Sequence, residues 1–196
     1  NPLKFGRCNK GELDIPPKLG QHTLKYLGKS TIKEKEDKDS AVALRQAFGT
    51  FTTGVTIATT LQNDGIPRGF TANSFSSVSL DPPLLLVCLS KNALSYKVFT
   101  ESNFFAINVL SENQKQVSAL FATQSEEKFV TTEWSYGFGN MPILKGCLSS
   151  FVCAKERIVD AGDHTILIGR VKKFLISDGR PLLYYKGQYV SPKSNT

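Results

Sequence analysis

Histidine and cysteine are scarce in this chain, whose 196 residues include only two histidines and four cysteines. Two imidazoles, His22 and His164, cannot supply a histidine-rich metal site. The cysteines are Cys8, Cys88, Cys147 and Cys153, and no two of them form a C-x-x-C pair or another zinc-ligand spacing. We therefore predict no metal site, and we interpret the cysteines as free thiols in a reducing compartment.

Long apolar runs and several well-known motifs are also missing. No apolar stretch approaches the length of a membrane span, and no secretory leader pattern is present. The patterns G-x-G-x-x-G, G-x-x-x-x-G-K-[ST] and G-x-S-x-G do not occur. These absences argue against a Rossmann site, a P-loop and a serine nucleophile. They predict a soluble, cytoplasmic protein that does not contact membranes.

Basic residues outnumber acidic ones by 24 to 17, which gives a net charge of +7. Residues 1–40 hold nine basic and six acidic residues, so +3 of the excess lies there and +4 in the remainder. The excess is diffuse, and no nucleic-acid-binding motif accompanies it. We predict no nucleic-acid partner, and we expect the charge to attract a phosphate-bearing small molecule.

The order of the apolar segments predicts a mainly β domain over residues 41–196, preceded by a polar N-terminal arm over residues 1–40. Val55–Leu61 alternates as a half-buried strand does, and Asn63-Asp64-Gly65 is a strong hairpin signal. That hairpin would return the chain through one strand from Ile66 to Phe75. Further strands are expected at Leu84–Leu89, Phe104–Leu110, Gly146–Val159, His164–Ile176 and Leu182–Val190. Seven strands at mostly hairpin spacing predict a closed or nearly closed barrel with peripheral helices.

Three short helices are expected beside these strands. Ser40 is a suitable N-cap for the first, whose apolar face would hold Leu44, Ala47, Phe48 and Phe51. Asn92 would cap the second, and Ser111 with Gln114 forms a capping box for the third.

The stretch Thr71–Ser79 is unusual, because it combines strand-compatible residues with many small hydroxyls and one amide. A strand core does not require these groups, whereas a flat polar heterocycle carrying a phosphate would use them. Free N–H groups at the start of the second helix, near Asn92, Ser95 and Lys97, would form a phosphate seat. An ordinary capped helix with exposed lysines explains the same residues, so both interpretations stay open.

His164 lies where a turn meets a strand, directly after Asp163. It is either a solvent-facing turn residue or an imidazole that supplies a hydrogen bond or a positive charge to a reaction.

Together these segments resemble the flavin reductase-like domain family over residues 44–190. The resemblance is carried by Thr71-Ala72-Asn73-Ser74-Phe75, Ser77-Val78-Ser79-Leu80 and Asp81-Pro82-Pro83. It is also carried by Thr53-Gly54-Val55-Thr56, Asn108-Val109-Leu110, Phe121-Ala122, Gly162-Asp163-His164-Thr165-Ile166 and Leu182-Leu183-Tyr184-Tyr185-Lys186-Gly187-Gln188-Tyr189.

This resemblance implies an FMN-binding split β-barrel with a few peripheral helices. It implies a homodimer that binds FMN or FAD and reduces it with NADH or NADPH. It further implies a monooxygenase partner, to which such reductases hand free reduced flavin. Residues 1–40 exceed what the family requires, and we expect this arm to wrap the dimer.

The resemblance also assigns roles to residues. The isoalloxazine and ribityl chain would be lined by Thr71, Ala72, Asn73, Ser74, Phe75, Ser77 and Val78. Asn92, Ser95 and Lys97 would lie by the phosphate, and Ala122 and Thr123 would complete the flavin pocket. The nicotinamide nucleotide would be faced by Tyr185, Lys186, Gly187 and Gln188, and by His164 as the catalytic residue.

This chemistry asks little of acids and bases, because the cofactor carries the reactivity and the protein orients the two rings. Two alternatives remain, namely a non-catalytic flavin-binding sensor or carrier and an oxidase of the pyridoxamine-phosphate type, which shares the split barrel. His164 and the segment Tyr185–Gln188 favour the reductase, because a flavin binder that does not turn over needs no dinucleotide face.

Overall fold

The computed structural model describes residues 38–192. None of the helices in this range is long and apolar enough to cross a membrane. The chain divides into two units after Ala41, and the sheets belong to the second unit, Val42–Thr196. Cys8, His22 and nearly all of the predicted N-terminal arm fall outside the described residues.

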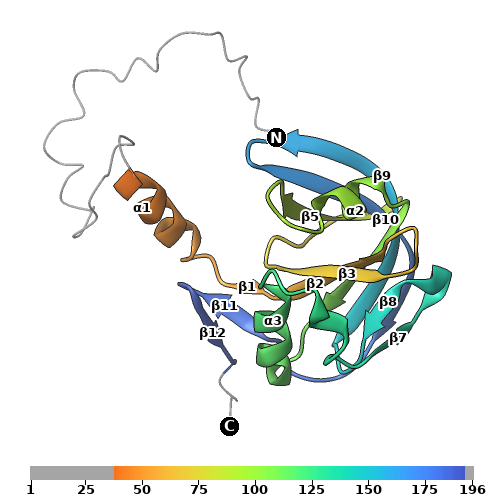
Figure 1. Ribbon diagram of the computed structural model, residues 1–196. Coiled ribbons are helices and arrows are strands. Elements are labelled where there is room, and N and C mark those ends of the chain that lie inside the picture. Colours follow the sequence, from red (N-terminus) through yellow and green to blue (C-terminus); the bar gives the residue numbers. More distant parts are fainter. Residues whose placement is uncertain (1–37, 193–196) are drawn as a thin grey trace, which may run out of the picture. The chain divides into compact units, whose positions relative to one another are not determined.

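The main sheet has seven antiparallel strands in the order β3-β2-β6-β9-β10-β5-β4. Their bounds are β3 Pro67–Ala72, β2 Thr56–Leu61, β6 Phe104–Val109, β9 Ser149–Ala161, β10 His164–Ile176, β5 Pro83–Ser90 and β4 Ser76–Leu80. Figure 1 shows these strands bending round into a barrel. The expectation of a mainly β barrel is therefore confirmed.

Two smaller sheets and a few short helices complete the described residues. One sheet joins β1 (Thr53–Gly54), β11 (Leu183–Tyr185) and β12 (Gln188–Val190), and the other joins β7 (Trp134–Tyr136) and β8 (Pro142–Leu144). The α-helices are α1 (Lys38–Phe48), α2 (Tyr96–Glu101) and α3 (Lys115–Phe121), with 3-10 turns η2 (Glu112–Gln114), η3 (Glu127–Phe129) and η4 (Phe138–Asn140). Helix α3 packs against β2 and β3.

Several polar side chains are buried with the apolar core, and one of them, the amide of Asn108, joins four strands. Asn108 of β6 is fully buried, and its Nδ2 donates to the carbonyl of Ile57 and to Thr59 Oγ1, both at 3.2 Å. Its Oδ1 accepts from the amide of Leu144 at 3.1 Å and from Ser150 Oγ at 2.9 Å. The asparagine of the Asn108-Val109-Leu110 motif thus has a structural role, which is to hold β2, β8 and β9 around β6.

The predicted hairpin at Gly65 and the capping box are confirmed. Gly65 has φ +83, and Gln62 donates to the carbonyl of Ile66 at 2.9 Å across the turn. The backbone N–H of Ser111 donates to Gln114 Oε1 at 3.0 Å, and η2 then leads into α3.

Several strand boundaries differ from the expected ones. The strand predicted over Ile66–Phe75 ends at Ala72, and the chain then leaves β2 to form β4 beside β5. The strand predicted over Leu182–Val190 is a tight hairpin, because Lys186 and Gly187 adopt positive φ values of 47° and 81°. Both turns carry polar residues within an otherwise strand-like stretch. Neither has a Gly-Pro or Asn-Gly pair, which would have indicated a turn.

Two expected burial patterns are also wrong. Val55 and the strand β2 are buried on both faces, because β2 lies between β3 and β6 and is covered by α3 and β8. The continuous apolar run Leu84–Leu89 predicts a fully buried strand, but β5 is buried on one face only, at Leu85, Val87 and Leu89, and half-buried on the other.

The first two helices do not start where expected. Ser40 lies inside α1 and does not cap it, and Leu44 and Phe48 are 47% and 70% exposed in the described chain. Helix α2 begins at Tyr96 and has six residues, so Asn92 lies in the preceding loop. A phosphate seat at a helix N-terminus is therefore not formed at Asn92.

We predict that Asn108→Ala lowers the free energy of unfolding by roughly 3 kcal/mol, because it leaves buried donors and acceptors without partners. Urea unfolding measures this change. The matched control, Asn63→Ala in the exposed hairpin turn, should stay within about 0.5 kcal/mol of the parent. A similar, small effect for both variants would contradict the structural role of Asn108.

Candidate functional site

A cavity of about 510 Å³ opens where β3 and the end of β5 face one another without pairing. It is walled by β3, the loop after β3, the last residues of β5, the loop before α2, and the segment from Phe121 to Phe129. His164, the first residue of β10, also lines it. We refer to this cavity as the seam pocket.

The seam pocket exists because β3 and β4 are the two edges of the main sheet. Strand β4 pairs with β5 only as far as Leu86, so the edge of β5 from Val87 onward is not covered by a strand. The Ser74 side chain bonds to this uncovered edge of β5. The amide of Cys88 donates to Ser74 Oγ at 2.9 Å, and Ser74 Oγ lies 3.3 Å from the carbonyl oxygen of Cys88. One side chain thus stands where a paired strand would otherwise close the barrel.

The predicted hydroxyl donors are partly engaged by the protein itself. Thr71 Oγ1 donates to the carbonyl of Ser118 at 2.6 Å and ties β3 to α3. A hydroxyl has a single proton, so Thr71 can only accept a further hydrogen bond while this contact persists. The side-chain amides of Asn73 and Asn92, which also line the pocket, can still donate to a ligand.

Most of the predicted cofactor-binding residues come together at the seam pocket. Its lining includes Thr71, Ala72, Asn73, Ser74, Asn92, Ser95, Ala122, Thr123 and His164. Four others do not line it. Phe75 stacks on Phe151 with ring centroids 6.0 Å apart, Ser77 and Val78 lie exposed on β4, and Lys97 is paired with Glu101 at 3.8 Å.

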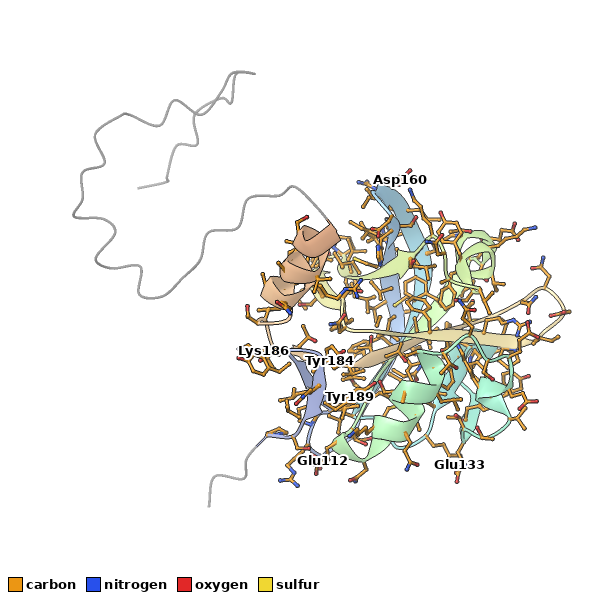
Figure 2. The ribbon with its side chains drawn as sticks, turned by 60° about the vertical axis from the view of Figure 1, so that its left-hand side comes forward. Glu112, Glu133, Asp160, Tyr184, Lys186 and Tyr189 are labelled. Atoms are coloured by element: carbon orange, nitrogen blue, oxygen red, sulfur yellow. The ribbon has the colours of Figure 1, made fainter. Side chains whose placement is uncertain are left out.

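The predicted nicotinamide segment lies elsewhere in the chain. Lys186 and Gly187 line a different cavity of about 610 Å³, together with Arg45 and Thr50. The amide of Lys186 donates to the carbonyl of Gly49 at 2.8 Å. Figure 2 shows Lys186 in the β11–β12 region, well separated from Asp160 at the tip of the β9–β10 hairpin. Tyr185–Gln188 therefore do not join His164 at the seam pocket of their own chain.

Two cations of the seam pocket were missed by sequence reasoning. Lys128 Nζ donates to the carbonyls of Gly69 at 3.2 Å and of Phe121 at 3.0 Å, and Arg68 lines the same pocket. Burial, followed by the charge of Arg68, lowers the pKa of Lys128. Within residues 38–192 neither cation forms an ion pair. An anion beside them would offset both the repulsion between the two cations and the free-energy cost of burying the Lys128 charge.

The close approach of α3 to β3 depends on Gly69. A Cβ on Gly69 would lie 2.8 Å from the Phe121 ring and 2.9 Å from the carbonyl oxygen of Ala58. Only glycine lets Phe121 approach β3 this closely, which places the segment that carries Lys128 against the pocket. No local sequence pattern around Lys128 indicated this placement.

His164 is held at the rim of the pocket by its neighbours. It is opposite Ser90 in the β5–β10 ladder, and its Nδ1 lies 2.8 Å from Asp163 Oδ1. This contact with the imidazole lowers the pKa of the Asp163 carboxyl.

The cysteines of the described chain differ in accessibility. Burial raises the pKa of Cys147 to about 11 and that of Cys153 to about 12, so both remain protonated thiols at neutral pH. Cys88 is half-buried and lines the seam pocket.

Comparisons with known proteins bear on this site. The family model described as the flavin reductase like domain matches residues 48–193. This match covers about three quarters of the chain. The chain belongs to the flavin reductase-like domain family.

Relatives within this family share much of the sequence. The reductase component of a flavin-dependent trigonelline monooxygenase from Acinetobacter baylyi is 49% identical over 154 residues, which cover 78% of this chain and 50% of the relative. The stachydrine N-demethylase reductase subunit Stc3 of Rhizobium meliloti is 46% identical over 158 residues, covering 81% of this chain and 69% of the relative. The chain thus spans about half the length of the Acinetobacter protein.

Solved structures agree with the fold. The NADH:FAD oxidoreductase SgcE6 of Streptomyces globisporus, in complex with NAD and FAD fragments, is 36% identical and matches with a TM-score of 0.77 over 83% of this chain and 99% of that chain. The flavin reductase PheA2 is 38% identical, with a TM-score of 0.74 over 81% of this chain and 100% of that chain. The main sheet is therefore the split barrel of flavin reductases.

We predict that, in a Cys8→Ser variant, FMN slows the alkylation of Cys88 by iodoacetamide, because Cys88 lines the pocket. Cys147 and Cys153 should not react at pH 8, since their raised pKa values keep them protonated, and should become reactive only as the pH approaches those values. Peptide mass mapping measures each site. Equal labelling of Cys88 with and without FMN would contradict flavin binding in the seam pocket.

Proposed function

We propose that this protein is an NAD(P)H-dependent flavin reductase, which transfers a hydride from NADH or NADPH to FMN or FAD. The observation that supports this proposal most is the composition of the seam pocket. It combines side-chain amides, an uncovered strand edge, a histidine and two cations that form no ion pair within residues 38–192, and membership of the flavin reductase-like family matches that composition.

The residues present fit a flavin nucleotide. Asn73 and the backbone around it offer donors to a polar heterocycle, and Arg68 and Lys128 offer positive charge to a phosphate. Lys97 was expected at the phosphate, but it lies outside the lining and pairs with Glu101. We therefore assign the main phosphate attraction to Arg68 and Lys128, with Asn92 and Ser95 as further polar contacts.

The bound flavin supplies the hydride-accepting chemistry, and the residues of this chain bind and orient it. Phe121 and Phe129 give the pocket an apolar wall, which limits the access of water to one side. His164, fixed by Asp163, presents its imidazole at the rim, where it would orient the nicotinamide nucleotide. Proton transfer by His164 is not required for hydride transfer.

The proposed protein partner is a monooxygenase that receives the reduced flavin. The names of relatives from Acinetobacter and Rhizobium, and of the HsaB subunit from Rhodococcus jostii, describe reductase parts of such two-component enzymes. A cytoplasmic location stays a prediction from the sequence.

We also propose a homodimer. The outer face of β9, β10 and β5 carries half-exposed apolar side chains next to His164, namely Val159, Ile166, Ile168, Leu84 and Leu86. A second copy covering this face would bury them. It would also give the Tyr185–Gln188 turn, which lies away from the seam pocket of its own chain, a route to the pocket of its partner.

Anaerobic mixing of the protein with FMN or FAD and with NADH or NADPH tests the proposed function. Loss of flavin absorbance in its visible band, over many turnovers, is the expected result, and the rates identify the preferred nucleotide and flavin. Tight flavin binding without bleaching by either nucleotide would contradict the proposal and leave a non-catalytic flavin carrier.

A further inference from the structure

Lys91 follows β5 directly, between two residues that line the seam pocket, but it does not line the pocket itself. Its Nζ donates to Asp160 Oδ1 at 2.5 Å and to the carbonyl of Gly162 at 2.7 Å. Its backbone N–H donates to the carbonyl of Asp163 at 3.0 Å. Lys91 therefore binds the β9–β10 turn at three points, two of them through its ammonium group.

The turn that Lys91 holds leads directly into His164. It runs from Asp160 through Gly162, whose φ is +63°, to Asp163, and Figure 2 shows Asp160 at the tip of the hairpin. The side chain of Asp160 is 79% exposed. Pairing of Asp160 with Thr165 and of Ala161 with His164 holds the two strands together up to the turn, so Gly162 and Asp163 are the part that the Lys91 contacts fix. Exposed hairpin tips are mobile unless something ties them down. The Lys91 ammonium is such a tie, because it joins the tip to the end of β5.

We propose that Lys91 is a positioning residue for His164, which it acts on by fixing the Asp160–Asp163 turn against β5. The inference rests on the proposed function in one respect, namely that His164 meets the nicotinamide nucleotide. An exposed ion pair adds little to global stability, so removing it should leave the fold intact. Removing the ion pair should instead weaken binding of the nicotinamide nucleotide, because that binding depends on the position of the His164 imidazole.

A direct electrostatic role for Lys91 makes a different prediction. If the ammonium only attracted the negatively charged dinucleotide, removing the acidic partner Asp160 would strengthen binding. If the ammonium instead acts through the turn, removing Asp160 frees the turn and weakens binding. Lys91→Met and Asp160→Ala therefore change KM in the same direction under our proposal and in opposite directions under the electrostatic alternative.

The first experiment measures steady-state kinetics with NADH and FMN for Lys91→Met, Lys91→Arg and Asp160→Ala. We expect Lys91→Met and Asp160→Ala each to raise the KM for NADH about fivefold, with kcat within about twofold, because mispositioning removes uniform binding. Lys91→Arg keeps the charge and its donors and should restore most of the affinity. The matched control, Lys145→Met, removes a surface lysine that pairs with Glu133 at 3.3 Å and should change neither constant.

A double-mutant cycle tests whether Lys91 acts through His164. His164→Ala should raise the KM for NADH on its own, and adding Lys91→Met to it should raise KM no further. Multiplicative effects of the two substitutions would overturn the proposal. A lower KM in Asp160→Ala would also overturn it.

A second measurement needs no turnover. The chain has two histidines, so an imidazole NMR spectrum has two sets of ring signals, and His164→Ala identifies which set is His164. Lys91→Met should shift or broaden the His164 signals and leave those of His22 unchanged. Unchanged His164 signals would overturn the proposal. If the parent protein oxidises neither NADH nor NADPH, the proposed function fails, whereas the role of Lys91 is still decided by this spectrum.

Discussion

The hydrogen bonds between the Ser74 hydroxyl and the backbone of Cys88 are the contact on which the site depends. They occupy the edge of β5 beyond the end of β4, where a paired strand would otherwise complete a closed barrel. Because a single small side chain takes this place, β3 and β5 stay apart and leave a cavity between them. Predicted ligand contacts on β3, namely Thr71 and Ala72, and in the loop after β5, namely Asn92 and Ser95, line this cavity.

Charge in the cavity follows from the packing of α3 on β3. Gly69 admits the Phe121 ring, and the chain after α3 then brings Lys128 to two carbonyl oxygens at the edge of the pocket. Arg68 lies beside it without an acidic partner in the described chain. The diffuse net charge of +7 thus has a local counterpart at the one place where an anionic cofactor would be bound.

The sequence predicted the class of the fold from local signals, whereas the roles of the site residues came from the family resemblance and stay predictions. Hydrophobic alternation, the turn at Gly65 and the capping box at Ser111 each depend on neighbouring residues only. The ends of the strands could not be predicted from local signals. Whether the chain after Ala72 continues along β2 or crosses to β5 is decided by partners that are distant in sequence. Lys128 was missed for the same reason, since its contacts with Gly69 exist only after the barrel has formed.

The central claim is that the seam pocket holds the flavin nucleotide, with Lys128 beside its negative charge. Equilibrium titration with FMN, followed by the quenching of flavin fluorescence, tests it in the parent protein and in Lys128→Met, with thermal unfolding to verify the fold. We expect the Kd to be about tenfold weaker in the variant, because one charge-assisted contact is lost. An unchanged Kd in a folded Lys128→Met variant would contradict it.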